Sequence, residues 1–253
     1  MSFLPTLSAL SNFEQQMNKY EATAGNSQLK PGRSYANILA YDLRFNRINI
    51  QCNGYYQINK DPTATSVRRI DNGDSFYFLY NSELMKSFQH LQFMLFVNAE
   101  LIKNRLFLSA RGGINRFINI GYKYVHYYND YFSGIQLDGN YKNWTLSASL
   151  TSDMSRLTGE TIFYTSKNAY LDLKYRHKNF HIGIGVLNPL LPDGAPTGTR
   201  QIYPIVQSKS WNYTRDTGNM VYLSLNYSLS FGHKYDSGQK KLYNSDTESG
   251  VMK

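Results

Sequence analysis

The 253-residue sequence contains one cysteine and two tryptophans, and it has no long hydrophobic run. The single cysteine, Cys52, excludes an intramolecular disulfide and any zinc site built from cysteines. Because no run of about 18 apolar residues is present, the sequence offers no candidate for a transmembrane helix. No Gly-x-Ser-x-Gly element occurs in a strand–turn–helix setting, which gives no sign of that class of hydrolase. We therefore expect a protein that is not an enzyme and that has no catalytic residues.

Histidine is also scarce, with five residues in the chain. His177 and His181 are four residues apart, but they flank a predicted strand turn, and this spacing does not match known metal-ligand patterns. We expect no metal site and no cofactor.

Tyrosine and basic residues are abundant instead. The chain has 22 Tyr and 14 Phe, and its formal net charge is +9. A basic chain can bind nucleic acid or anionic lipid. Lysine and arginine are scattered here, and several lie in turns, so no basic stripe marks a nucleic-acid surface and we expect no nucleic-acid partner.

Apolar and polar residues alternate most clearly in residues 220–231. One set consists of Val221, Leu223, Leu225, Tyr227, Leu229 and Phe231, and the other of Tyr222, Ser224, Asn226, Ser228 and Ser230. Because successive side chains of a strand point to opposite faces, one face is apolar and the other is polar. A transmembrane β-strand needs about 9–11 residues of this kind. The pattern predicts a strand whose apolar face meets lipid.

Four predicted hairpins precede this strand. Their strands are expected at 34–45 and 47–58, 90–102 and 104–117, 130–141 and 144–153, and 167–177 and 180–187. Each short turn contains an asparagine, at Asn46, Asn104, Asn143 and Asn179, and asparagine tolerates the positive φ that tight turns require. The polar segments between the hairpins are predicted as long loops, at 59–88, 118–129, 154–166 and 188–218. Short turns at one end and long loops at the other are typical of bacterial outer-membrane barrels.

Aromatic residues recur on the apolar face beside the short turns. They are Phe45, Tyr141, Trp144, Tyr175, Phe180 and Phe231. Rings with a polar edge favour the headgroup boundary of a bilayer; the second hairpin has Leu101 and Leu106 there instead. On the polar face, Asp172, Lys174 and Arg176 are interpreted as a ladder of compensating charges toward a hydrated lumen.

A soluble β-sandwich is the structural alternative, because a sheet packed on a second sheet also alternates. Strands of ten or more residues, where about 5–6 is usual, favour the barrel. Nine strands are an odd number, bacterial barrels have an even number, and each unpaired peptide group in lipid costs several kcal/mol. We therefore expect an all-β fold: an antiparallel transmembrane β-barrel present in part, as about nine C-terminal strands of a larger barrel without its plug domain.

The predicted organisation has three parts. Residues 1–33 form an irregular segment that leads into the barrel, residues 34–231 form the antiparallel barrel strands, and residues 232–253 form a periplasmic C-terminal tail. Within the first part, residues 11–20 are expected to hold one turn of helix. The N-terminus lacks the basic region of a signal peptide, which suggests a mature chain or a piece of a longer one.

Several motifs are similar to those of a known family. They are GNSQLKP (25–31), YKNWTLSASL (141–150), LTGETI (157–162), GVLNPL (185–190) and YSLSFGHKYDSGQKKLYNSDTESGVM (227–252). Together they span most of residues 25–252 and resemble the C-terminal half of TonB-dependent outer-membrane receptors of the "outer membrane protein beta-barrel" type. Ser27 stands where that family usually has proline.

The resemblance implies a barrel of about twenty-two strands with an N-terminal plug, in the outer membrane of a Gram-negative bacterium. The implied function is energy-coupled import of a nutrient. The implied partners are the lipid bilayer, the missing N-terminal strands and plug, which another chain can supply, and TonB through that plug alone. The chain by itself is then expected to be inactive. Two other functions stay open: a small stand-alone outer-membrane barrel with a structural or adhesive role, and a soluble β-sandwich binding module.

One segment, GYKYVHYYNDYF (121–132), concentrates tyrosines near a predicted extracellular loop. Tyr124, Tyr127 and Tyr128 are the candidate ligand-contacting aromatics, since their rings can stack on a sugar or another ligand. The alternative interpretation is an outer aromatic girdle with loop packing.

Overall fold

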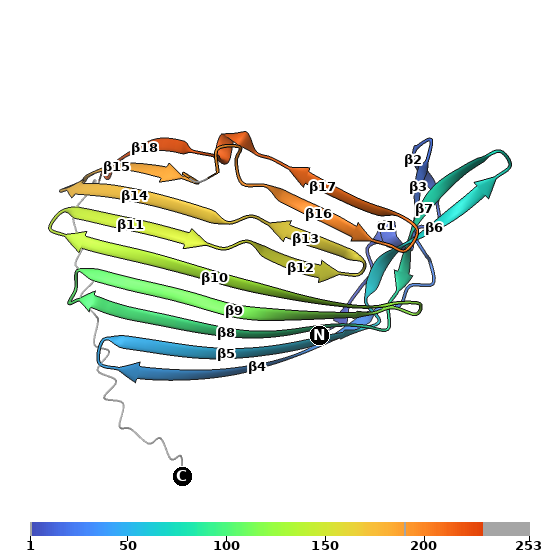
Figure 1. The fold of residues 1–253 in the computed structure, drawn as a ribbon, viewed down its shortest axis with the longest axis horizontal. Coiled ribbons are helices and arrows are strands. Elements are labelled where there is room, and N and C mark those ends of the chain that lie inside the picture. Colours follow the sequence, from blue (N-terminus) through green and yellow to red (C-terminus); the bar gives the residue numbers. More distant parts are fainter. Residues whose placement is uncertain (1, 190, 230–253) are drawn as a thin grey trace, which may run out of the picture.

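The computed structural model describes residues 2–189 and 191–229, which are mostly β-structure (Figure 1). The largest sheet has the order β1 (Ser2–Phe3), β4 (Gly32–Phe45), β5 (Ile48–Lys60), β8 (Ser87–Ile102), β9 (Leu106–Ile120), β10 (Val125–Tyr141), β11 (Trp144–Thr151), β14 (Asn168–His177), β15 (Phe180–Leu187) and β18 (Met220–Tyr227). All its pairings are antiparallel. In the described ranges, no helix has both the length and the apolar character that a membrane crossing requires.

The nine long strands of this sheet are the nine strands predicted from the sequence. Because neighbours are antiparallel and nine is odd, the two outer long strands, β4 and β18, run in the same direction. They lie at opposite edges of the sheet (Figure 1). Among the described residues, β18 pairs with β15 alone, and β4 pairs with β5 and with only two residues of β1.

The four short turns all lie at one end of the large sheet, at the left in Figure 1. Asn46 and Asn104 have the predicted positive φ, 47° and 55°. In the other two turns the prediction is wrong by one residue, since Lys142 and Lys178 have the positive φ. The reason is geometric: the two-residue turns place their left-handed residue first, and asparagine comes second there.

The segments predicted as long loops contain strands, so that prediction is wrong. Residues 59–88 hold the hairpin of β6 (Thr63–Asn72) and β7 (Ser75–Leu84), and residues 154–166 hold β12 (Met154–Thr158) and β13 (Thr161–Thr165). Residues 188–218 contain β16 (Thr197–Ile202), β17 (Gln207–Asn212) and the 3-10 helix η1 (Arg215–Thr217). Residues 118–129 mostly extend β9 and β10. Gly73 and Gly159, each with a φ of +60°, lie in the tight turns of the β6–β7 and β12–β13 hairpins.

The N-terminal segment also differs from its prediction. The helix α1 (Leu7–Leu10) lies before residues 11–20, and the Thr6 hydroxyl caps it by accepting from the Ala9 amide at 3.3 Å. Residues 11–20 instead contain β2 (Gln15–Asn18). Strand β3 (Glu21–Ala24) follows and pairs in parallel with β7, so this segment joins a four-stranded sheet of order β2-β3-β7-β6.

The second small sheet, of order β12-β13-β16-β17, extends the large sheet and packs on it. Figure 1 shows β12 and β13 continuing beyond β11 and β14. Leu157 and Ile162 from this sheet bury against Phe117 of β9, with exposures of 1, 6 and 6 %. Because Phe117 lies on the polar face of β9, the small sheet covers that face near its end away from the short turns.

The apolar face of the large sheet is exposed. On β18, Val221, Leu223, Leu225 and Tyr227 are 59–66 % exposed, as the alternation predicted. Strand β18 ends at Tyr227, and Phe231 and the predicted tail 232–253 lie outside the described residues. Four of the aromatic residues that the sequence places beside the short turns are also exposed: Phe45, Tyr141, Trp144 and Phe180. A β-sandwich would bury this face between two sheets, whereas the described residues leave it uncovered.

Candidate functional site

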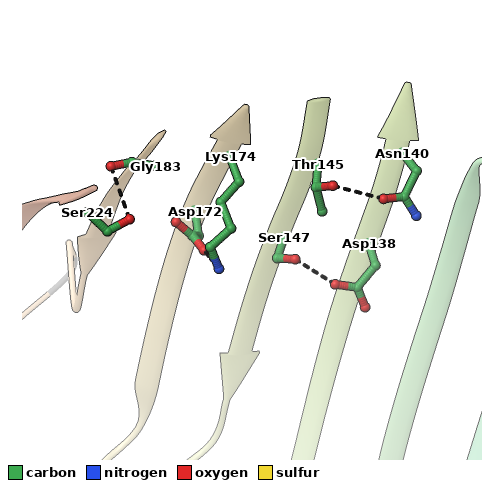
Figure 2. Close-up of polar contacts among 8 residues, drawn as sticks. All are labelled: Asp138, Asn140, Thr145, Ser147, Asp172, Lys174, Gly183 and Ser224. Carbon is green, nitrogen blue, oxygen red and sulfur yellow. Dashed lines mark hydrogen bonds and ion pairs between the residues drawn. The ribbon is translucent and has the colours of Figure 1, made fainter. Parts of the chain in front are cut away.

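The polar face of the large sheet is the candidate site, and cross-strand register arranges its side chains in rows. Two rows lie near the short turns, and Figure 2 draws their members except Gly185 and Tyr222. One runs Asp138–Ser147–Asp172–Gly185–Tyr222, and the other runs Asn140–Thr145–Lys174–Gly183–Ser224. Because side chains alternate, the rows one residue before and after each of these belong to the apolar face.

Hydrogen bonds join neighbouring strands along these rows. The Ser147 hydroxyl donates to Asp138 Oδ1 at 2.8 Å, and the Thr145 hydroxyl donates to Asn140 Oδ1 at 3.1 Å (Figure 2). Lys174 forms an ion pair with Asp172, whose side chain is only 6 % exposed. The sequence prediction that Asp172 and Lys174 share a face is confirmed, and Lys174 supplies the opposite charge for a buried carboxylate.

Two glycines on β15 make room for larger polar side chains on this face. A Cβ at Gly185 would lie 2.4 Å from Cζ of Tyr222, and a Cβ at Gly183 would lie 2.6 Å from Oγ of Ser224. The Tyr222 ring therefore lies directly against the β15 backbone.

A second polar network lies farther from the short turns. Asn115, only 2 % exposed, accepts hydrogen bonds at Oδ1 from Gln92 Nε2 at 2.9 Å and from His90 Nε2 at 3.0 Å. An amide oxygen can only accept, so His90 carries its proton on Nε2. Asp130 Oδ1 accepts from the Ser155 backbone N–H at 2.9 Å, which ties the large sheet to β12.

A cavity of about 810 Å³ lies between this network and the small sheet. Gln57, His90, Gln92 and Asn115 line it from β5, β8 and β9, and β12, β13, β16 and β17 line the other side. Its volume falls within the range of about 300–1,000 Å³ that is usual for ligand pockets.

The three candidate tyrosines lie in different environments. Tyr127 is on the apolar face and is 63 % exposed, with the Arg116 guanidinium 5.7 Å from its ring centroid. Tyr128 points to the opposite face, where it packs against the core of Phe117 and its neighbours. Tyr124 lies in the turn between β9 and β10. The structure does not bring the three rings together, and ligand contact by each of them stays a prediction.

Tyr124 belongs to a cluster around a buried glutamate. Glu160 is 4 % exposed and its Oε1 lies 3.1 Å from His126 Nε2, while the Tyr124 ring stacks on the His126 ring at 4.8 Å. Burial, followed by the charge of Glu160, raises the pKa of Tyr124 well above its usual value. The motif LTGETI contains Glu160, but nothing in the sequence indicated that the loop folds back to His126.

His177 and His181 lie on opposite faces of the β14–β15 hairpin, because His177 pairs with Phe180 and Arg176 pairs with His181. Across the described ranges, no group of three or more His, Cys, Asp or Glu side chains is arranged to hold a metal ion.

Comparisons with protein-family models, with curated proteins and with solved structures find no match for this chain.

Proposed function

We propose that the chain is the C-terminal barrel portion of an outer-membrane TonB-dependent receptor that imports a nutrient. The observation that carries the proposal is the exposed apolar face, which runs across nine long antiparallel strands and lies opposite a hydrogen-bonded polar face. Proteins in water rarely expose an apolar surface of this extent, whereas the outward band of a membrane barrel is apolar and its interior polar.

The aromatic residues near the short turns support the same proposal. Trp144 and Tyr175 lie with ring centroids 4.7 Å apart, and the guanidinium of Arg105 lies 5.7 Å from the Tyr141 ring centroid. Aromatic rings and cations at the ends of spanning strands fit a boundary between acyl chains and headgroups.

The receptor part of the proposal depends on the sequence motifs. The edges at β4 and β18 agree with it, because an edge in lipid needs further strands. In this proposal those strands and the plug come from another part of the same protein or from another chain, and TonB acts through the plug.

Cell fractionation tests the membrane part. The chain is produced in a Gram-negative host with a signal peptide fused ahead of Met1, because its own N-terminus lacks the basic region of a signal peptide. It is expected in the outer-membrane fraction and is expected to resist carbonate extraction. Recovery in the soluble fraction would contradict the proposal and favour a soluble binding module.

The DNA upstream of the Met1 codon tests the receptor part. An adjacent reading frame for a plug and further barrel strands supports a receptor. Its absence would favour a small stand-alone barrel with a structural or adhesive role.

A further inference from the structure

We infer that the cavity between the large sheet and the β12-β13-β16-β17 sheet binds a neutral, hydroxyl-rich ligand of the oligosaccharide class. This inference deepens the proposed function, because it names the class of cargo. It depends on the chemistry of the two cavity walls.

The wall formed by the large sheet is rich in amides. Gln57, Gln92 and Asn115 contribute side-chain amides, beside His90. Amides both donate and accept hydrogen bonds, as hydroxyl groups do, so the two kinds of group complement each other in either direction.

These amides are held in place before any ligand arrives. Gln92 and His90 both donate to Asn115, and the His90 ring stacks on Phe117 with centroids 4.5 Å apart. Gln57 Nε2 donates to Asn59 Oδ1 at 3.0 Å, and its Oε1 accepts from the Tyr55 hydroxyl at 2.8 Å. Side chains that are already ordered lose little conformational entropy on binding.

The opposite wall offers the aromatic ring of Tyr164, and Trp211, which is not part of the lining, packs beside that ring. Ser155, Tyr164, Gly198 and Trp211 form one cross-strand row, in which the Tyr164 and Trp211 ring centroids lie 5.4 Å apart. Gly198 permits this, since a Cβ there would lie 2.5 Å from the Trp211 ring. The flat C–H face of a sugar ring is apolar and packs well on such rings.

The lining carries little charge. Of the described residues around the cavity, Arg156 alone has a formal charge at pH 7 when histidine is neutral. Arg156 points to the face opposite Ser155, and its guanidinium lies 5.1 Å from the Phe163 ring centroid. A ligand with several carboxylates or ammonium groups would find no oppositely charged side chain in this lining besides Arg156, and this disfavours such ligands.

Calorimetric titration of the full chain tests the inference, in lauryldimethylamine oxide because this detergent has no sugar headgroup. The probes are maltohexaose, cellohexaose and xylohexaose, with hexagalacturonate as the acidic counterpart. At least one neutral hexasaccharide is expected to bind saturably, and about tenfold more tightly than hexagalacturonate. The inference would be overturned if no neutral probe bound saturably. It would also be overturned if hexagalacturonate bound as tightly as the neutral probes or more tightly.

Matched variants locate the site. Gln92→Leu and Tyr164→Ala are each expected to weaken binding about tenfold, the effect of about 1.4 kcal/mol. Gln51→Leu is the control, because Gln51 lies on the same polar face of β5 but outside the cavity lining. Circular dichroism checks that each variant keeps its β-structure. Binding is compared for the cavity variants that keep it. Binding by a folded cavity variant equal to that of the unsubstituted chain, or an equal loss in Gln51→Leu, would overturn the assignment.

The outcome separates this inference from the proposed function. A chain that fractionates with soluble proteins yet binds a neutral hexasaccharide refutes only the proposed function. A chain in the outer membrane that fails the titration refutes only the ligand class.

Discussion

At the scale of single residues, small side chains decide how closely polar groups approach the sheet. Gly185 and Gly54 both lie within long strands, but on opposite faces. A Cβ at Gly185 would meet the Tyr222 ring at 2.4 Å, whereas a Cβ at Gly54 would meet nothing nearer than 3.9 Å. The polar face is therefore closely packed at Gly185, whereas the apolar face has space at Gly54.

Replacing Gly185 with alanine is expected to push the Tyr222 ring out of its row and to lower the free energy of unfolding by about 1–3 kcal/mol. Urea unfolding of the chain in lipid vesicles measures this change. Gly54→Ala is the control and is expected to leave stability unchanged or slightly higher, since alanine restricts the unfolded chain. Equal effects of the two substitutions would contradict the packing described here.

Cys52 gives a natural probe of the apolar face. It lies on β5 in register with Leu95 and Tyr41, and the next residue, Asn53, points to the polar face. If acyl chains cover the apolar face, a charged maleimide reacts slowly with Cys52 in proteoliposomes, because neither the reagent nor the thiolate is stable there. Asn53→Cys in a Cys52→Ser background is expected to react faster. Mass spectrometry measures the labelled fraction, and equal rates would refute lipid contact at this position.

Tyr124 is expected to make stability depend on pH at the alkaline end. Its pKa is raised in the folded chain, so the neutral phenol stabilises the fold below the ordinary value of 10.0, and this contribution is lost as the pH rises above that value toward the folded pKa. The free energy of unfolding of the unsubstituted chain, relative to that of Tyr124→Phe, is therefore expected to fall above pH 10.0. Urea unfolding at several pH values measures it.

Glu160→Gln provides a check on the cause. Burial is the larger cause and the charge of Glu160 the next. The substitution is therefore expected to lower the pKa of Tyr124 without restoring its ordinary value. The measurement is the difference in phenolate absorbance between each chain and its Tyr124→Phe counterpart, which removes the signal of the other tyrosines. A pKa of Tyr124 that does not change would exclude the contribution of Glu160.

At the scale of strands, the two faces of β18 differ in what they are expected to tolerate. Leu223 and Asn226 are both exposed and lie on opposite faces of this strand. Leu223→Lys is expected to lower the free energy of unfolding by about 2–4 kcal/mol if Leu223 lies near the bilayer midplane. If the same face meets water, the substitution is expected to change it by no more than about 0.5 kcal/mol. Asn226→Lys is expected to cost little in both cases. Urea unfolding in vesicles separates the two media, and equal small costs would refute a lipid-facing β18.

The sequence predicted long strands well because alternation repeats over many residues. The pattern from Val221 to Tyr227 is an example, since one face needs apolar and the other polar side chains whatever the neighbours are. It predicted turn geometry less well. Lys142 has positive φ because the turn requires it at that position, and asparagine was the wrong guide there.

The small sheets were missed for a different reason. Apart from β6 and β7, their strands have only four to six residues. Glycines such as Gly73 also look the same in a loop and in a hairpin turn. The Asn115 network joins β8, β9 and β10 to β12, and the cavity beside it is also lined from β5, β13, β16 and β17. No local pattern encodes such an assembly, because it depends on β12 folding back over β9.

At the scale of the whole molecule, the sheet edges at β4 and β18, as far as the described residues go, are expected to make the isolated chain associate. Edge strands with free backbone groups pair with other chains. In detergent, β4 of one copy can pair antiparallel with β4 of another, and β18 with β18, so that repeated pairing gives a range of sizes. Light scattering in detergent is expected to give masses above the 29.2 kDa of one polypeptide, rising with concentration. The same sample unfolded in hot dodecyl sulfate serves as the single-chain reference. A monomer at every concentration would show that the edges are already satisfied.

In the proposed barrel, the common direction of β4 and β18 limits which further strands can close the sheet. If every pair of neighbouring strands is antiparallel, the added strands must begin and end with a strand that runs opposite to β4 and β18. The number of added strands is then odd. A second copy inserted the same way up also begins and ends with strands like β4, and it would meet the first copy in parallel. Closing the proposed barrel therefore requires a polypeptide segment different from this chain. The closed barrel would then contain one copy of this chain and one copy of that segment.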